Sequence, residues 1–254
     1  MEIFNYLAFA FIGASLGLVG AGGSILTMPV LVYLFKIPPL LATSYSLFIV
    51  GITSLLAAIE KARQAEMQLK PALTFGLVSM GVVMVIRHFI IPMLPKSGYN
   101  LIALILFAIL MILAAFSMIR KKYSALTAAQ VNWLAAVPYT ILIGLVTGFL
   151  GAGGGFLLIP VLTQLLAMDM KKAVGTSLAV IAINSLAGFV SDIKHVYIHW
   201  QFLSAITLIA LAGALIGVLL CRQIKSNNLK LGFGWFVLVL GVAILGTEFL
   251  SVLK

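Results

Sequence analysis

The chain has 254 residues, of which 63% are hydrophobic and only 9% are charged. Soluble domains carry about 25% charged residues, so this composition excludes a water-soluble globule and indicates an integral membrane protein. The formal net charge of +10 comes from short basic clusters between apolar runs, which is typical of topology signals and not of nucleic-acid binding. A single cysteine, Cys221, excludes an intrachain disulfide.

Eight apolar segments follow one another along the chain. A membrane-spanning helix needs about 20 apolar residues. The segments are 3–35, 40–59, 71–86, 101–119, 133–168, 173–191, 202–221 and 231–247. We therefore predict an all-α integral membrane protein with two homologous halves of four segments each. The first repeat covers 1–122 and the second covers 123–254, and together they form one transmembrane domain.

The first segment of each half is too long for one straight helix. Residues 3–35 would span about 50 Å as an α-helix, whereas the hydrocarbon core is about 30 Å thick. Each long segment contains a cluster of small residues: Gly20-Ala21-Gly22-Gly23 in one, and Gly151-Ala152-Gly153-Gly154-Gly155 in the other. Clustered glycines destabilise a helix. Each segment is therefore predicted to form a helix, an irregular turn and a short helix.

The two clusters belong to an internal repeat. The twelve residues from Gly20 match the twelve from Gly151 at eight positions, including a proline at the same spacing. Downstream, Ala42-Thr43-Ser44 matches Gly175-Thr176-Ser177. Chance similarity between apolar stretches does not explain a glycine cluster followed by proline at the same spacing twice.

The distribution of Lys and Arg indicates how the halves are oriented. If each long segment crosses the membrane once, the basic residues divide evenly between the two sides. If both long segments are re-entrant hairpins, one side keeps only Lys36, Arg87, Lys96, Lys194 and Lys254. The positive-inside rule favours the hairpins, which give inverted repeats with both termini outside. Residues 133–150 are nevertheless long enough to cross fully, so the alternative stays open.

Inverted repeats with interrupted helices point to a substrate site near the midplane. The short helices begin near Ser24 and Gly155, where free N–H groups and the positive dipole end can bind an anion. Tight helix packing is the alternative role of the glycines. The predicted substrate-binding residues are Gly20, Ala21, Gly22, Gly23, Ser24, Thr43, Ser44, Gly151, Ala152, Gly153, Gly154, Gly155, Thr176, Ser177 and Asn184.

The polar members of this set have structural alternatives. The hydroxyls can donate to a sulfonate or carboxylate oxygen, but they can equally cap or back-bond to their own helices. Asn184 lies mid-span, where contact with a neighbouring helix is as good an explanation as contact with a ligand.

Charged residues at the segment ends are expected to be topological. Arg87 is expected to snorkel to the interface rather than draw anions into a vestibule. Two pairs at matching span ends are expected to mark edges rather than a proton relay: Glu60 with Lys61, and Asp192 with Lys194. The sequence has no catalytic motif and no set of metal ligands, so it predicts no enzyme, cofactor or metal site.

The doubled glycine segment, followed in each half by Thr-Ser, resembles the TauE/SafE sulfite exporter family. This family is also called the 4-toluene sulfonate uptake permease (TSUP) family. The resemblance covers nearly the whole chain. It implies transport of sulfur-containing anions, such as sulfite, sulfoacetate, thiosulfate or aryl sulfonates, across the prokaryotic inner (cell) membrane. It also implies that the motif residues line the pathway. Ser24 stands where the second copy has Gly155, and Ala42 where it has Gly175, so the half-sites are unequal.

The expected function is secondary transport of small sulfur-containing or organic anions by alternating access around the two glycine breaks. The energy would come from a coupling ion (H+ or Na+) or from the anion's own gradient. A non-transporting membrane scaffold or assembly factor is the alternative. The expected partners are the anionic substrate and the lipid bilayer, without nucleic acid, and a homo-oligomer is compatible with the sequence.

Overall fold

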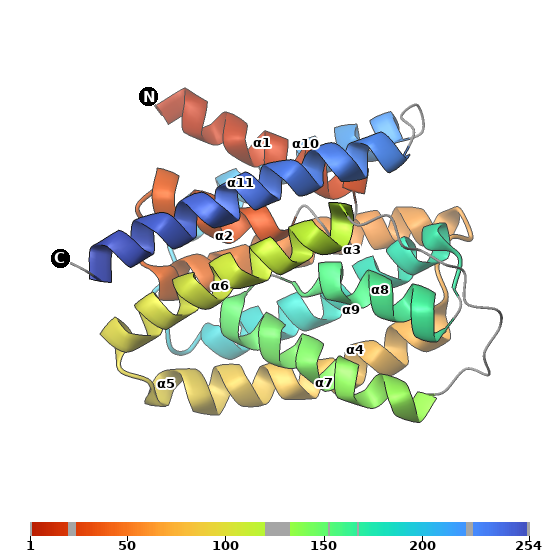
Figure 1. Cartoon of the computed structure of the whole chain (residues 1–254), viewed down its shortest axis with the longest axis horizontal. Coiled ribbons are helices and arrows are strands. Elements are labelled where there is room, and N and C mark those ends of the chain that lie inside the picture. The colour runs from red at the N-terminus through yellow and green to blue at the C-terminus, as the bar shows by residue number, and fades with distance from the viewer. Residues whose placement is uncertain are drawn as a thin grey trace.

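A computed structural model describes residues 2–19, 24–119, 133–151, 153–166, 168–221 and 226–252. Within these ranges the chain is helical with short connections, and it contains no β-strand (Figure 1). The boundary between the predicted repeats, at residues 122 and 123, lies outside the described ranges, so the division into repeats stays a prediction.

The first half begins with helix α1 and ends with helix α6. Its elements are α1 (Glu2–Val19), α2 (Thr27–Pro29), the π-helix η2 (Val30–Leu34), α3 (Pro39–Arg63), α4 (Leu69–Val85), the π-helix η3 (Ile86–Ile90), α5 (Ile91–Met93) and α6 (Lys96–Ile119). Proline at the first position of α3 suits a helix start, because that position needs no N–H donor. The first glycine cluster, residues 20–23, lies outside the described ranges.

The second half repeats this order with fewer interruptions. Its helices are α7 (Trp133–Leu150), α8 (Gly155–Leu165), α9 (Met170–Asp192), α10 (Trp200–Cys221) and α11 (Ser226–Val252). The second long apolar segment is broken at its glycine cluster, as predicted, between the end of α7 and the start of α8. Helix α9 begins with a side-chain cap, in which Asp169 accepts a hydrogen bond from the Lys171 N–H.

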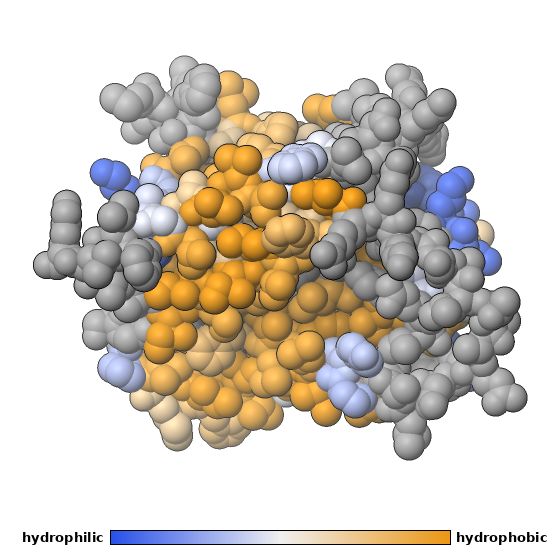
Figure 2. Space-filling view, viewed as in Figure 1, coloured by the Kyte–Doolittle hydropathy of each residue, from blue (hydrophilic) through white to orange (hydrophobic). Residues whose placement is uncertain are grey.

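The helices are those of a multi-pass membrane protein. Among the described residues, four helices are long and apolar enough to span a bilayer: Pro39–Arg63, Leu69–Met93, Lys171–Asp192 and Trp200–Gly217. Shorter apolar helices accompany them. Large apolar side chains such as Leu77, Leu113 and Leu208 are more than half exposed. Figure 2 shows hydrophobic residues across the middle of one face, with hydrophilic residues toward its left and right ends. This apolar surface suits contact with lipid.

Helices α3 and α9 form an antiparallel pair at the centre. The α3 span is 67% buried and the α9 span 72% buried, against 39% for the spans of α4 and α10. Gly51 of α3 lies against Leu186, and Gly188 of α9 lies against Leu47. Because one number rises as the other falls, the two helices run in opposite directions.

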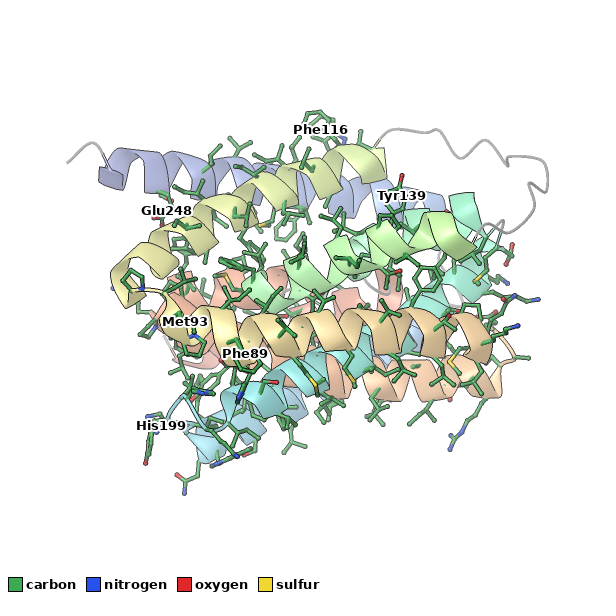
Figure 3. The ribbon with its side chains drawn as sticks, turned by 90° about the horizontal axis from the view of Figure 1, so that it is seen from below. Phe89, Met93, Phe116, Tyr139, His199 and Glu248 are labelled. Atoms are coloured by element: carbon green, nitrogen blue, oxygen red, sulfur yellow. The ribbon has the colours of Figure 1, made fainter. Side chains whose placement is uncertain are left out.

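We name the two ends of the helix bundle after residues at the ends of this central pair, Asp192 and Glu66. At the Asp192 end, Ser44 near the start of α3 donates a hydrogen bond to Asp192 at the end of α9. At the Glu66 end, the Gln68 N–H that follows α3 donates to Thr176 near the start of α9. Figure 3 shows His199, Met93 and Phe89 toward the Asp192 end.

The outer helices of one half pack on outer helices of the other half. Helix α1 packs along α10, and α7 packs along α4. Gly213 lies against Ala10 and Gly217 against Ala14, so the two numbers rise together and α1 and α10 run parallel. Helices α7 and α4 run parallel in the same way, and α6 packs on α11. Glycine and alanine at such contacts let the helix backbones approach closely.

Each broken segment returns to the end from which it started (Figure 1). Helix α1 runs parallel to α10 and therefore starts from the Asp192 end, and the chain is back there when α3 begins at Pro39. Helix α7 runs parallel to α4 and starts from the Glu66 end, and the chain is back there when α9 begins at Met170.

Candidate functional site

Residues beside the two glycine clusters meet at the middle of the central pair. A Cβ on Gly153 would lie 3.0 Å from Val50 of α3, 3.0 Å from Ile181 of α9 and 3.4 Å from the Oγ of Ser24. Ser24 directly follows the first break, and it is fully buried. Residues from both halves thus converge near the midpoints of α3 and α9.

Glycine is required by the backbone of the second break. The φ angles of Gly151, Gly153 and Gly154 are +66°, +68° and +63°, a region that L side chains rarely adopt. A Cβ on Gly154 would also lie 2.4 Å from Thr147 Oγ1. The predicted site residues Gly20, Ala21, Gly22, Gly23 and Ala152 lie outside the described ranges.

Only the second break is followed by a regular α-helix. Helix α8 has 11 residues and begins at Gly155, which is buried. After the first break the chain forms a 3₁₀ turn over residues 24–26, then the three residues of α2 and the π-helix η2. Aligned N–H groups and a helix dipole are therefore available at α8 and not at the predicted helix near Ser24.

Buried polar side chains surround the breaks. Within the described part of the chain, Thr27, Ser54, Thr147, Ser185 and the amide nitrogen of Asn184 are buried without a hydrogen-bond partner. Ser54 lies one turn beyond Val50, Ser185 one turn beyond Ile181, and Thr27 one turn beyond Ser24. A buried polar group without a partner costs about 1–3 kcal/mol, so such a concentration requires an explanation, and ligand binding supplies one.

Asn184 connects this region to α4. Its Oδ1 accepts a hydrogen bond from Ser79 at 2.9 Å, and both residues are fully buried. One end of the amide therefore holds two helices together, as the packing alternative predicted. The amide nitrogen remains available to a ligand.

A second polar cluster lies at the Asp192 end. Arg87 of η3 donates from Nη1 to Asp192 Oδ2 at 2.5 Å and to Thr43 Oγ1 at 3.3 Å. Its Nε donates to the carbonyl of Gly148 at 2.6 Å. Ser44 also donates to Asp192 Oδ2, at 2.5 Å. Thr43 and Ser44 are thus brought together with two charged residues that were not predicted to belong to a site.

The expectation for Arg87 was wrong. Its side chain is 0% exposed and forms an ion pair with Asp192, whose side chain is 5% exposed, so it does not snorkel to an interface. Asp192, which was expected to mark the edge of a span, is instead buried and bound to Arg87. At the other end, Lys61 pairs with Glu66 at 2.6 Å.

Thr176 and Ser177 lie far from Thr43 and Ser44, the residues that they match in the repeat. They are at the Glu66 end, where Thr176 accepts from the Gln68 N–H at 3.0 Å and Ser177 donates to the Val174 carbonyl at 2.8 Å. Gly175 packs there against the Glu66 backbone, because a Cβ would lie 2.0 Å from its oxygen. The two Thr-Ser pairs therefore occupy opposite ends of the central helices.

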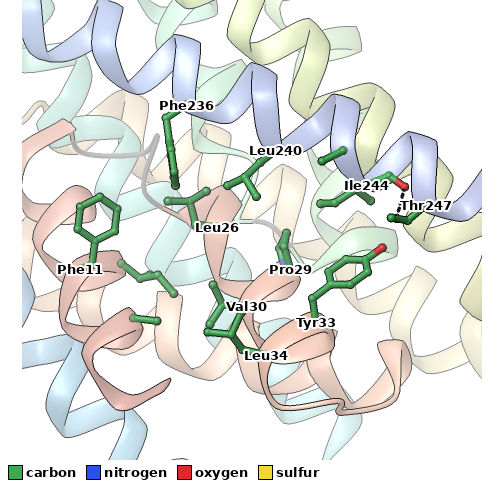
Figure 4. A pocket seen from close by; sticks show the side chains of 13 residues that line it. Phe11, Leu26, Pro29, Val30, Tyr33, Leu34, Phe236, Leu240, Ile244 and Thr247 are labelled. Atoms are coloured by element: carbon green, nitrogen blue, oxygen red, sulfur yellow. Dashed lines mark hydrogen bonds between the residues drawn. The ribbon is translucent and has the colours of Figure 1, made fainter. Parts of the chain in front are cut away.

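A cavity of about 290 Å³ is lined by none of the residues of the two polar clusters. It opens between α1, α2, η2 and α11, and its lining is almost entirely apolar (Figure 4). The Tyr33 hydroxyl, at its rim, donates to Glu248 at 2.9 Å. No group of His, Cys, Asp and Glu residues within the described ranges could hold a metal ion.

Lipid-facing helices around a central pair, with residues beside the two glycine clusters meeting at its middle, agree with a membrane transport protein. The sequence comparisons agree. The chain belongs to the sulfite exporter TauE/SafE family, whose profile matches residues 6–244. The resemblance seen in the glycine motifs is thereby confirmed.

Its relatives cover most of the chain. It is 28% identical to a "Probable membrane transporter protein" of Xylella fastidiosa, over 92% of this chain and 90% of the relative. It is 26% identical to the "Probable membrane transporter protein YunE" of Bacillus subtilis, over 84% and 85%. A relative in Methanocaldococcus jannaschii is 28% identical over 90% and 89%. These names describe transporters and not enzymes. No solved structure matches the chain.

Proposed function

We propose that the protein is a secondary transporter of small sulfur-containing or organic anions, such as sulfite, thiosulfate and sulfonates. It works by alternating access around the two glycine breaks, in the inner membrane of a prokaryote. Membership of a family described as sulfite exporters supports the substrate class. The observation that carries the mechanism is the meeting of Ser24 and Gly153 at the centre of the bundle, among buried polar atoms without partners.

An inverted repeat is part of this proposal. Helices α3 and α9 occupy equivalent places in the two halves and run antiparallel, which is expected when a two-fold axis lies in the membrane plane. The partner exchange of α1 with α10 and α7 with α4 agrees with such an axis. So does the return of each broken segment to its starting end, as a re-entrant hairpin does.

The second break is closely packed. A Cβ added to Gly153 would lie 3.0 Å from Val50 and from Ile181, so we expect a solute to reach the centre only when the hairpins move relative to the central pair. The N-terminus of α8 then offers N–H groups to an anion, and the hydroxyls nearby can donate to its oxygens. Glycine lets the anion approach the backbone closely.

Transport is tested with purified protein in liposomes. Proteoliposomes loaded with unlabelled sulfite are expected to accumulate external [35S]sulfite by counterflow. Gly153→Leu is expected to abolish counterflow, because the new side chain would occupy the space between α3, α9 and Ser24 and would require a φ of +68°. Gly81→Leu is the matched control, because a Cβ there meets nothing within 4 Å.

The outcomes separate transport from the scaffold alternative. Gel filtration first shows that both variants remain folded, and Gly153→Ala serves if the leucine variant does not. Counterflow in the wild type and in Gly81→Leu, with none at Gly153, supports the proposal. Wild-type counterflow in the Gly153 variants would remove the break from the mechanism. No counterflow of sulfite, thiosulfate or sulfonates by the wild type would favour a scaffold.

A further inference from the structure

Arg87 is a fully buried cation whose hydrogen-bond donors are only partly used. Its Nε and Nη1 are bonded, whereas its Nη2 has no hydrogen-bond partner among the described residues. The residue lies in the π-helix η3, and such interruptions of α-helices are frequent at functional sites. Burial of a guanidinium with an unused donor is costly, so a structural role alone does not account for this arrangement.

The free donor lies beside the donor that binds Asp192. Together Nη1 and Nη2 form one edge of the guanidinium fork, which matches the spacing of two oxygens on a carboxylate, sulfonate or sulfite group. Asp192 binds Nη1 through one oxygen, Oδ2, and it shares that oxygen with Ser44. An incoming oxyanion can therefore accept two hydrogen bonds from Arg87, whereas Asp192 accepts one.

The cluster is joined to the second glycine break. Gly148, which accepts from Arg87 Nε, lies in the last turn of α7, three residues before Gly151. Ser46 donates to the carbonyl of Gly151 at 2.9 Å. A Cβ on Gly151 would lie 2.6 Å from the carbonyl oxygen of Thr43. A change of partner at Arg87 therefore acts on the residues that hold the break in place.

We propose that Arg87 binds the transported oxyanion in place of Asp192, and that Asp192 takes up one proton as it is displaced. This inference rests on the proposed transport function and adds the coupling ion to it. The charges balance: the anion neutralises Arg87, and the proton converts the Asp192 carboxylate into a neutral acid that can donate to Ser44. A monovalent anion then crosses with one proton, without net movement of charge.

Other titratable groups surround this end of the bundle and have to be distinguished from Asp192. His88 follows Arg87 on η3, and its ring lies 5.5 Å from the ring of His195. Lys194 and His199 follow α9, and Tyr45 of α3 accepts from the His199 N–H. Of these residues only Arg87 is bonded to the carboxylate of Asp192. A pH dependence caused by the histidines would persist when Asp192 is replaced, so a neutral substitution there separates the two causes.

Binding of methanesulfonate at different pH values tests the proposal. This probe keeps a single negative charge between pH 5 and pH 8, so any pH dependence belongs to the protein. Titration calorimetry of the detergent-solubilised full chain is expected to show a wild-type Kd that rises about tenfold per pH unit where Asp192 is ionised. Asp192→Asn is expected to bind more tightly than the wild type at pH 8, with a Kd that does not change with pH.

Two further variants complete the design. Asp169→Asn is the matched control on the same helix, because Asp169 is an exposed N-cap at the Glu66 end and asparagine caps equally well. It is expected to keep the wild-type slope. Arg87→Gln/Asp192→Asn removes both charges, leaves no unpaired buried ion and is expected to fold without binding the probe.

Each result decides a separate part of the proposal. Binding by the double variant with wild-type affinity would show that Arg87 is not the anion site. A wild-type Kd that is flat with pH, with binding lost in the double variant, would retain Arg87 and overturn proton uptake. No binding by any form would overturn the inference. The [35S]sulfite counterflow experiment judges the transport function independently of these results.

Discussion

Neutralising Asp192 is expected to destabilise the folded protein, because it leaves the Arg87 guanidinium buried without its counter-ion. The pair has a 2.5 Å contact, and its side chains are 0% and 5% exposed, so water cannot screen the lost charge. Breaking a buried pair by removing one partner costs about 3–5 kcal/mol. Asp192→Asn is expected to lower the free energy of unfolding by about 3 kcal/mol, since the new amide oxygen can still accept from Ser44 and Arg87.

The opposite substitution is expected to cost more. Arg87→Gln leaves a buried carboxylate and removes the donor to the Gly148 carbonyl, so its loss is expected at about 4–5 kcal/mol. The double variant has no buried charge and is expected to lose no more than about 2 kcal/mol. The coupling free energy between the two positions is therefore expected to exceed about 3 kcal/mol.

Reversible unfolding in mixed detergent micelles measures these differences. SDS titration followed by circular dichroism gives the free energy of unfolding for the wild type, both single variants and the double variant. Single-variant losses below about 1 kcal/mol, or a double variant that loses the sum of both, would refute the reasoning that the pair is buried and mutually dependent.

Three further predictions concern packing and topology. Gly213→Ala is expected to lower the free energy of unfolding by about 1–3 kcal/mol, because its Cβ would lie 2.1 Å from a backbone oxygen of α1. Gly246→Ala is the control in the same unfolding assay. Its Cβ would meet nothing within 4 Å, so it is expected to be neutral or slightly stabilising. Tyr33→Phe is expected to lose about 1 kcal/mol with the hydrogen bond to α11, and a loss above about 3 kcal/mol would contradict a simple surface contact. Cysteines at Glu2 and Lys36, in a cysteine-free background, are expected to react with impermeant maleimide from the same side of the membrane, and labelling from opposite sides would reject the hairpin of the first segment.

The helical layout could be predicted because its causes are local. Apolar length marks a span, and the glycine cluster from Gly151 to Gly155 marks the end of α7 and the start of α8. The same reasoning failed in detail after the first cluster, where Ser24 opens a 3₁₀ turn and not a regular helix. Nothing in the sequence there distinguishes the two conformations.

The buried ion pair could not be predicted from local patterns. Arg87 and Asp192 are 105 positions apart, and each stands at the end of an apolar run, where charged residues usually face water. A usable signal did exist. The hairpin arrangement puts Arg87 on the same side of the membrane as Lys194, and hence close to the level of Asp192. The separation of Thr43 from Thr176 follows from the antiparallel run of α3 and α9, which the repeat alone does not reveal.

The exchange of partners between the halves has a consequence for biosynthesis. The face of α1 that packs on Gly213 and Gly217 has no partner until the ribosome has made more than 200 residues. The face of helix α4 that packs on α7 likewise has no partner until α7 has been synthesised. The N-terminal half therefore enters the bilayer with these faces uncovered, and lipid or the insertion machinery has to shield them until the C-terminal half arrives. We therefore expect neither half to fold stably when it is expressed alone.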